Sequence, residues 1–318
     1  MRSAFIVAAA AAVGVSAPPV ANVDPRTPSP PIPAWNAGEI PGASLPILKD
    51  RRYLMSGAAR PLLFWIGRDD IGLARIVWRR GREGARGYEL LVGTDPERAP
   101  RGLNRWGFIT EETLGETGAV LALMTGSHET SYEQEAEGVE RGAPGADFRA
   151  IRSRTTGGAT EWRLARVRTR EALTVHQAGD ALDLVRTDGR AADRRREIGA
   201  DVRPGFLIAV ADLVEATVAA SRSGGGTPEE GVRYVFGEQL YELRVRDTES
   251  VRVDVAGRLT PGIETSFETR ALGTGKRTRF RLTIGTEGET LGVPLAIEWQ
   301  PRWWLRVSLR LDAPRAAR

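Results

Sequence analysis

Tyr241-Glu242-Leu243-Arg244-Val245-Arg246 alternates apolar and charged side chains at every second residue. Successive side chains of a β-strand point to opposite faces of a sheet, so this stretch predicts a strand with one apolar and one solvated face. The same period recurs in runs with these apolar residues: Val251, Val253 and Val255; Phe280, Leu282 and Ile284; Leu295, Ile297 and Trp299; and Leu305, Val307, Leu309 and Leu311. Half-buried antiparallel strands show such alternation, and the C-terminal third is therefore predicted to be a β-meander.

Short stretches of turn-forming residues separate these runs. They are Asp247-Thr248-Glu249-Ser250, Pro261-Gly262, Gly273-Thr274-Gly275 and Gly285-Thr286-Glu287-Gly288. The N-terminal half, from about Leu48, contains less regular runs of the same kind. Its strand candidates are Leu62–Ile66, Ala74–Trp78, Tyr88–Val92, Val120–Met124, Phe148–Arg154, Glu161–Arg168, Leu173–His176 and Leu182–Arg186.

One segment has a helical period instead. After Pro204, apolar residues recur at intervals of three and four from Phe206 to Val218, and Gly224-Gly225-Gly226 ends the pattern. Two acidic residues within it indicate a helix that packs on a core rather than one that crosses a membrane. A single helix at about residues 204–222 among roughly a dozen strands predicts a mainly β fold, a large curved antiparallel sheet or barrel-like meander with one core-packing helix.

The order of elements from residue 206 to residue 311 also supports a resemblance. Its features, in chain order, are the apolar helix that ends near Arg222, the strand pair around Tyr241–Val245, and the segments Leu259-Thr260-Pro261-Gly262 and Val293-Pro294-Leu295-Ala296-Ile297. Earlier in the chain, Phe64-Trp65-Ile66-Gly67 and Asp70-Ile71-Gly72 match the opening hairpin of the same pattern. This pattern resembles an uncharacterised family of bacterial exported β-rich proteins, a domain of unknown function, over most of residues 60 to 311. The resemblance implies a curved or barrel-like antiparallel sheet in the cell envelope, and it implies no catalytic residues.

The N-terminus indicates export. Arg2 precedes an apolar or small-residue stretch from Ala4 to Val15, and Ser16 and Ala17 follow as small residues, which is the layout of a secretory signal peptide. We expect cleavage after Ser16 or Ala17, so that residues 1–16 form the signal peptide and the mature chain has no transmembrane span. Residues 17–47 form a proline-rich extended linker, and residues 48–318 form a single β-rich domain with a possible sub-boundary near 190–204. The predicted location is the periplasm, with the extracellular medium as the alternative.

Composition excludes several kinds of chemistry. The chain contains no cysteine and two histidines, which rules out disulfides, thiol nucleophiles, thiolate metal sites and a three-histidine metal site. Its net charge of +4 is within the ordinary range for a soluble domain and requires no nucleic-acid partner. We therefore expect no cofactor, no metal and no nucleic acid, and the pattern does not predict an oligomeric state.

No catalytic residues are predicted. Gly273-Thr274-Gly275-Lys276 lacks the earlier glycine of a phosphate-binding loop, and a hairpin turn accounts for it. Ser127 and His128 are adjacent, and the doublet Glu111-Glu112 is likewise consecutive. Adjacent residues on a strand point to opposite faces, so neither pair would converge on one substrate.

Two segments are candidates for ligand binding. The loop from Gly93 to Gly107 places Arg101, Asn104, Arg105 and Trp106 close together, where they could offer hydrogen-bond donors and a stacking face. The alternative is that Trp106 fixes the loop to the sheet. The doublet Asp69-Asp70 is the second candidate, with a hairpin turn as its alternative.

Three functions are compatible with this pattern. The favoured one is a non-enzymatic envelope module whose curved sheet holds an apolar or amphipathic ligand, such as a lipid or another envelope component, or serves as an interaction surface. The second is an envelope hydrolase that acts on glycans through carboxylates. The third is an outer-membrane β-barrel, because alternation does not distinguish lipid-facing from core-facing residues.

Overall fold

The computed structural model describes residues 44–60, 65–115, 117–125, 147–156, 158–168, 173–178, 193–302 and 305–312. This part of the chain is mainly β, as predicted, and its strands form one antiparallel sheet. The strands are β1 (Ile47–Ala59), β2 (Ile66–Arg80), β3 (Arg86–Thr94), β4 (Trp106–Leu114), β5 (Thr117–Thr125), β6 (Asp147–Thr156), β7 (Ala159–Arg168), β8 (Asp193–Glu197), β9 (Val232–Phe236), β10 (Gln239–Val255), β11 (Arg258–Ala271), β12 (Arg277–Gly285), β13 (Pro294–Arg302) and β14 (Leu305–Leu311). The α-helix α3 (Phe206–Arg222) connects β8 to β9.

The predicted signal peptide and nearly all of the predicted linker fall on residues 1–43, outside the described part, and β1 begins at Ile47. Within the described part, no helix has both the length and the apolar character of a membrane span.

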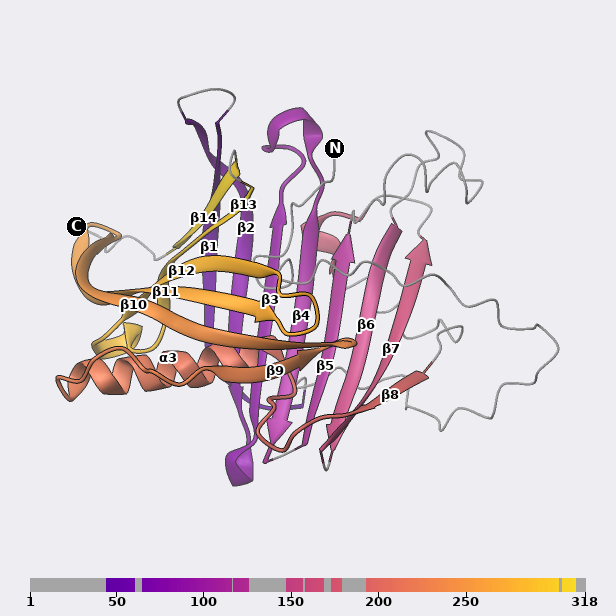
Figure 1. Ribbon diagram of the computed structural model, residues 1–318. Coiled ribbons are helices and arrows are strands. Elements are labelled where there is room, and N and C mark those ends of the chain that lie inside the picture. Colours follow the sequence, from indigo (N-terminus) through magenta and orange to yellow (C-terminus); the bar gives the residue numbers. More distant parts are fainter. Residues whose placement is uncertain are drawn as a thin grey trace.

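Two meanders make up the sheet. The strands from β1 to β8 pair in chain order, those from β9 to β14 do the same, and β1 pairs with β14 to join the two groups. The first meander forms a broad layer, and β9 to β12 run across it with α3 along one rim (Figure 1). The sheet curves without closing. Two contacts connect the regions of its end strands: Arg194 of β8 forms an ion pair of 3.2 Å with Glu238 in the turn after β9, and Arg203, between β8 and α3, forms a bridge with Tyr234 of β9.

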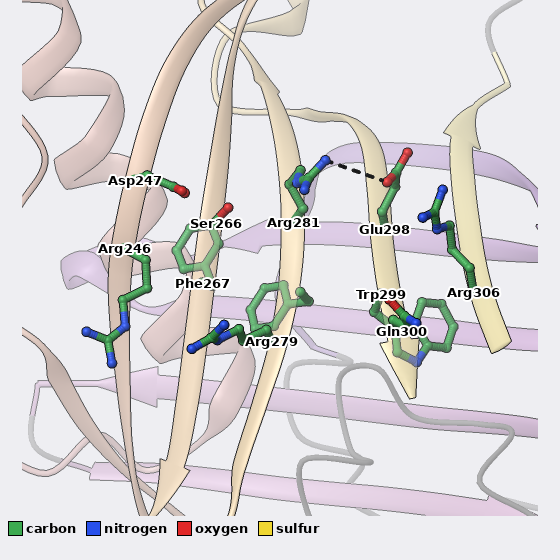
Figure 2. Close-up of a pocket in the computed structure, with 11 residues that line it drawn as sticks. Arg246, Asp247, Ser266, Phe267, Arg279, Arg281, Glu298, Trp299, Gln300 and Arg306 are labelled. Atoms are coloured by element: carbon green, nitrogen blue, oxygen red, sulfur yellow. Dashed lines mark ion pairs between the residues drawn. The ribbon is translucent and has the colours of Figure 1, made fainter. Parts of the chain in front are cut away.

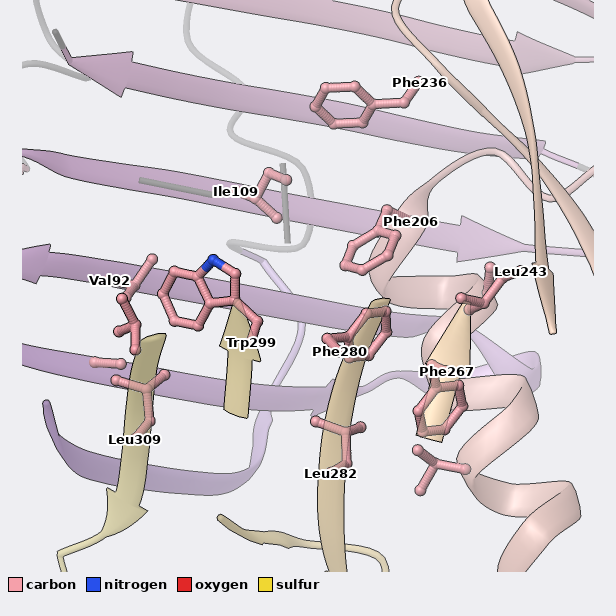
Figure 3. Close-up of a cluster of buried hydrophobic side chains, with 14 of the residues drawn as sticks. Val92, Ile109, Phe206, Phe236, Leu243, Phe267, Phe280, Leu282, Trp299 and Leu309 are labelled. Atoms are coloured by element: carbon pink, nitrogen blue, oxygen red, sulfur yellow. The ribbon is translucent and has the colours of Figure 1, made fainter. Parts of the chain in front are cut away.

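The inward-facing side chains of both meanders form one hydrophobic core. Phe267, Phe280, Trp299 and Val307 lie opposite one another on successive strands, so their side chains form a continuous apolar row. The rings of Phe267 and Phe280 stack with centroids 5.1 Å apart, and Phe206 of α3 meets Phe280 edge-on at 6.0 Å. Figure 3 shows these side chains gathered between the meanders and the helix. The two-residue period therefore predicts which side chains build the core.

Helix α3 is held in place by a carboxylate that is buried in the core. Glu111 of β4 is fully buried, and its two carboxylate oxygens accept hydrogen bonds of 2.9 Å from the backbone N–H groups of Phe206 and Ile208. These donors belong to the first turn of the helix, where backbone N–H groups have no partner within the helix. Burial raises the pKa of Glu111 to about 7, because desolvation outweighs the hydrogen bonds that favour the charged form.

Two glycines allow this contact. A Cβ at Gly205 would lie 2.2 Å from the Glu111 carboxylate, and a Cβ at Gly118 of β5 would lie 2.2 Å from the ring of Pro204. The helix begins at Phe206, two residues after Pro204: Gly205 is its N-cap, and Pro204 packs on the sheet just before it. At the other end, Gly224 has a positive φ of 70°, in agreement with the expected glycine stop.

Several local predictions were wrong. Asp247–Ser250 and Pro261-Gly262 lie inside strands, because β10 and β11 pair along their whole length and satisfy each other's backbone groups. The turn between them is Ala256-Gly257, in which both residues have positive φ. Val175–Gln177 forms a 3-10 turn instead of a strand, stabilised by a capping box between Thr174 and Gln177. The strand expected at Leu182–Arg186 lies outside the described residues.

We expect the Glu111→Ala substitution to lower the free energy of unfolding by about 2–4 kcal/mol, because it leaves two buried N–H groups without an acceptor. Glu112→Ala, on the same strand but the opposite face, is the matched control and should cost less than about 1 kcal/mol. Urea denaturation of both variants measures the difference. Equal losses would contradict the role assigned to Glu111.

The raised pKa of Glu111 predicts a pH dependence of stability. Between pH 4.5 and about 7 the folded protein retains a proton that the unfolded chain releases, so this group favours folding at low pH and loses that contribution as pH rises. The shift corresponds to roughly 3 kcal/mol. The free energy of unfolding of the wild type, relative to Glu111→Gln, should therefore fall between pH 4.5 and pH 8. A constant difference would show that Glu111 titrates normally.

Candidate functional site

An apolar cavity lies between α3 and the sheet. Its volume is about 110 Å³, and it is lined by side chains from α3, β2, β3, β12, β13 and β14. The helix contributes Leu207, Val210, Ala211 and Val214, which are spaced three and four residues apart and therefore share one face. The sheet contributes mostly apolar side chains, among them Ile76, Trp78, Leu90, Val92, Phe280, Leu282, Ile297, Trp299 and Leu309.

The position of α3 determines the shape of this cavity. A second helix face, with Ala209 and Leu213, is buried in the core, and Phe206 lies in the core while also lining the cavity. The remaining cavity-lining face is turned toward β2 and β3. Asp212 fixes this rotation through hydrogen bonds of 2.9 Å from Arg86 and 2.6 Å from Arg203. Several cavity-lining residues of the helix and sheet are only half-buried, so the cavity opens toward solvent.

Trp299 brings an unpaired polar group into this apolar environment. The side chain is 4% exposed, and its indole N–H is buried without a hydrogen-bond partner. Figure 3 shows the indole among Val92, Phe206 and Phe280. A buried donor without an acceptor costs about 1–3 kcal/mol, which makes this N–H a site where a ligand oxygen would be stabilised.

A second, polar pocket lies beside the first. It has a volume of about 590 Å³, and its charged lining consists of Arg246, Arg279, Arg281, Arg306, Asp247 and Glu298. Figure 2 shows the four arginines on β10, β12 and β14 around the mouth of the pocket. Phe280 and Trp299 line both the polar pocket and the apolar cavity.

A nearly buried carboxylate organises part of this pocket. Glu268 is 4% exposed and accepts hydrogen bonds from Arg246, Arg277 and Arg279. Burial raises its pKa, but the hydrogen bonds and positive charges of these arginines outweigh burial and leave the pKa below its usual value. Glu268 is therefore held as a carboxylate, and it fixes the guanidinium groups around it.

The doublet Asp69-Asp70 is not brought together as a binding pair. It lies in β2 at a bulge opposite Ser56 rather than at a hairpin turn, and Asp70 has a positive φ of 56°. Asp70 pairs with Arg98 at 2.6 Å, whereas Asp69 lies 3.6 Å from Arg310. The two carboxylates therefore serve separate surface ion pairs.

The loop from Gly93 to Gly107 is folded onto the sheet. Trp106 is fully buried, and its indole N–H donates a 2.8 Å hydrogen bond to the Leu173 carbonyl, which also accepts from the Asn104 side chain at 3.0 Å. Arg105 is half-buried, and the side chain of Arg101 lies outside the described part of the chain. Trp106 and Asn104 thus fix the loop to the segment around Leu173.

The arginine pocket and Trp299 were not predicted as a site. One strand carries an arginine at every second position, Arg277, Arg279 and Arg281. The sequence pattern predicted only that these side chains form the solvated face of the strand. A run of three arginines on one face is a signal of positive charge, but the register that brings Arg246 and Arg306 beside them is set by the pairing of distant strands.

The described residues contain no set of three His, Asp or Glu side chains placed to hold a metal ion. Glu111 and Glu112, the carboxylate doublet of β4, diverge as expected for consecutive strand residues. Glu111 is turned into the core, whereas Glu112 is half-buried on the other face.

No family model matches this chain, and no curated protein matches its sequence. Among solved structures, the chain is similar to the crystal structure of a beta-barrel-like protein of domain of unknown function DUF1849 from Brucella abortus. That similarity has a TM-score of 0.45 at 8% sequence identity, and it covers 83% of this chain and 98% of the other.

The packing of the Gly93–Gly107 loop predicts the effect of removing its tryptophan. Trp106→Ala should lower the free energy of unfolding by about 3–5 kcal/mol, since it deletes a fully buried indole and its hydrogen bond. Trp65→Ala, a half-buried tryptophan at the start of β2, is the control and should cost less. Thermal or urea denaturation measures both. A small loss for Trp106→Ala would instead leave the loop available for binding.

Proposed function

We propose that this protein is a non-enzymatic binding module of the bacterial envelope that holds the chain of an amphipathic ligand in the cavity between α3 and the sheet. The observation that carries the proposal is the buried, unpaired indole N–H of Trp299, a residue that lines this mostly apolar cavity. An ester, acid or amide oxygen near the start of an acyl chain would accept a hydrogen bond from this group. The remaining lining would surround the methylene groups of the chain.

The size and position of the cavity are compatible with such a ligand. At about 110 Å³ it approaches the volume of dry apolar cavities that take up small apolar molecules. Polar contacts hold α3 mainly at its N-terminal half, through Glu111 and Asp212. A modest outward movement of the helix would lengthen the cavity for a longer chain while these anchors remain in place.

Export is part of the proposal. The stretch from Arg2 to Ala17 has the layout of a signal peptide, and a cysteine-free domain is compatible with an oxidising compartment. The periplasm is the location that we propose. An acyl-chain ligand fits that location because lipids and lipid-modified molecules are abundant components of the envelope.

A pair of matched substitutions tests whether the cavity binds the apolar chain of a ligand. Ala211→Trp should fill the cavity, because Ala211 lines it, whereas Ala216→Trp places the same side chain on the exposed face of the same helix. We expect the affinity for the neutral apolar dye N-phenyl-1-naphthylamine to fall at least about tenfold in Ala211→Trp and to stay unchanged in Ala216→Trp. Fluorescence titration measures both.

Native mass spectrometry of protein released from cells by osmotic shock provides an independent measurement. Co-purifying lipid in the wild type and its loss in Ala211→Trp would support the proposal. If the wild type binds no dye and carries no lipid, or if both tryptophan variants bind the dye equally well, the cavity is not a ligand site.

A further inference from the structure

The apolar cavity and the polar pocket share lining residues where the pairing between strands of the sheet is interrupted. Pairing between β12 and β13 ends at Phe280 and Trp299, and the register of β13 against β14 shifts between Trp299 and Arg302. The ladder between β12 and β13 does not continue past this pair, whereas the pairing of β13 with β14 resumes at Arg302 and Leu305. The same two aromatic side chains therefore border the apolar cavity on one side and the arginine-lined pocket on the other.

Three of the four pocket arginines, Arg246, Arg279 and Arg306, contact a fixed partner. Glu268 accepts hydrogen bonds from Arg246 and Arg279, and each guanidinium carries five N–H donors, so one carboxylate leaves donors available for another acceptor. Arg306 lies over the ring of Trp65, with its guanidinium carbon 4.9 Å from the ring centroid. Such preorganisation lowers the entropy lost when an anion binds.

The charge of the pocket favours an anion. Its lining contains four arginines against two carboxylates, Asp247 and Glu298. Arg281 lies 3.3 Å from Glu264 and 4.0 Å from Glu298, and both contacts are exposed to solvent, where ion pairs are weak. An incoming oxyanion can therefore compete for this guanidinium. Arginine binds carboxylate and phosphate oxygens through two parallel N–H donors.

We infer that the polar pocket binds the anionic head group, a phosphate or a carboxylate, of a single-chain amphiphile whose chain enters the apolar cavity past Phe280 and Trp299. This inference rests on the proposed function, and it names the ligand class: a chain of apolar carbon with an oxyanion at one end. The apolar carbon chain of the ligand contacts the inner face of the sheet, and its head group contacts Arg246, Arg279, Arg281 and Arg306. The Trp299 N–H lies between the two parts of the ligand.

Three probes with the same twelve-carbon chain test the inference: dodecyl phosphate, dodecanoate and the neutral monododecanoyl glycerol. Each probe is used below its critical micelle concentration. Inorganic phosphate serves as a head group without a chain. We expect the two anions to bind about tenfold more tightly than the neutral probe, and we expect about 1 M NaCl to reduce this difference. Calorimetric titration or displacement of N-phenyl-1-naphthylamine measures the affinities.

A double substitution locates the head group. Arg281→Gln with Arg306→Gln removes two pocket arginines without unpairing the buried Glu268. Arg75→Gln with Arg310→Gln removes two exposed arginines outside the pocket, each next to a single aspartate. The first pair should remove the preference for anions and the second pair should retain it. Thermal unfolding of both double variants checks that the fold is intact.

The outcomes separate this inference from the proposed function. If all three probes bind equally and the arginine variants change nothing, the chain site stands and the head-group site is wrong. If inorganic phosphate binds through Arg281 and Arg306 but no chain probe binds more tightly than phosphate, the anion site stands and the chain site is wrong. Equal loss of anion preference in both double variants would show a general charge effect and overturn the assignment to this pocket.

Discussion

The contact between Glu111 and the first turn of α3 determines where the helix lies. A carboxylate without contact to water is costly, yet here its two oxygens meet two backbone N–H groups that would otherwise be unpaired. Each side of the contact thus satisfies the other in a place that water does not reach. The position also requires that Gly205 have no side chain, since a Cβ there would overlap the carboxylate. The cavity between α3 and the sheet follows from this docking, because the helix start is fixed and its Leu207–Val214 face is left turned toward β2 and β3.

The alternation of apolar and polar residues at every second position was enough to predict the fold class. The helix was predicted from apolar residues spaced three and four apart and from the glycines that follow them. Both signals are local, because each depends on residues within one strand or one helix. The pairing of β1 with β14 and the contact of Glu111 with a helix almost a hundred residues away are not local. The same reason explains the wrong turns at Asp247–Ser250 and Pro261-Gly262. Residues that favour turns stay extended there because β10 and β11 pair with each other through both segments.

The candidate site also depends on contacts between residues far apart in the sequence, which local patterns do not reveal. The loop with Asn104 and Trp106 concentrates polar and aromatic residues, and these two side chains donate hydrogen bonds to the Leu173 carbonyl and hold the loop in place. The arginine pocket had no compact motif, since its four arginines come from three strands. A bulge between Val245 and Asp247 changes the phase of β10 and contributes to the placement of Arg246 beside Glu268. Neither the bulge nor the strand order could be read from spacing alone.

The alternation that builds the sheet also places apolar and cationic side chains next to each other along one strand. Along β12, Phe280 and Leu282 face the interior while Arg279 and Arg281 face outward, so each step along the strand changes the chemistry from apolar to cationic. In a continuous sheet these two faces are separated by the backbone and cannot contact one molecule. Where the ladder between β12 and β13 ends, Phe280 and Trp299 line both the apolar cavity and the polar pocket, which is the arrangement that the proposed ligand requires. The proposed site therefore needs no dedicated motif, because it uses an interruption in an ordinary half-buried sheet.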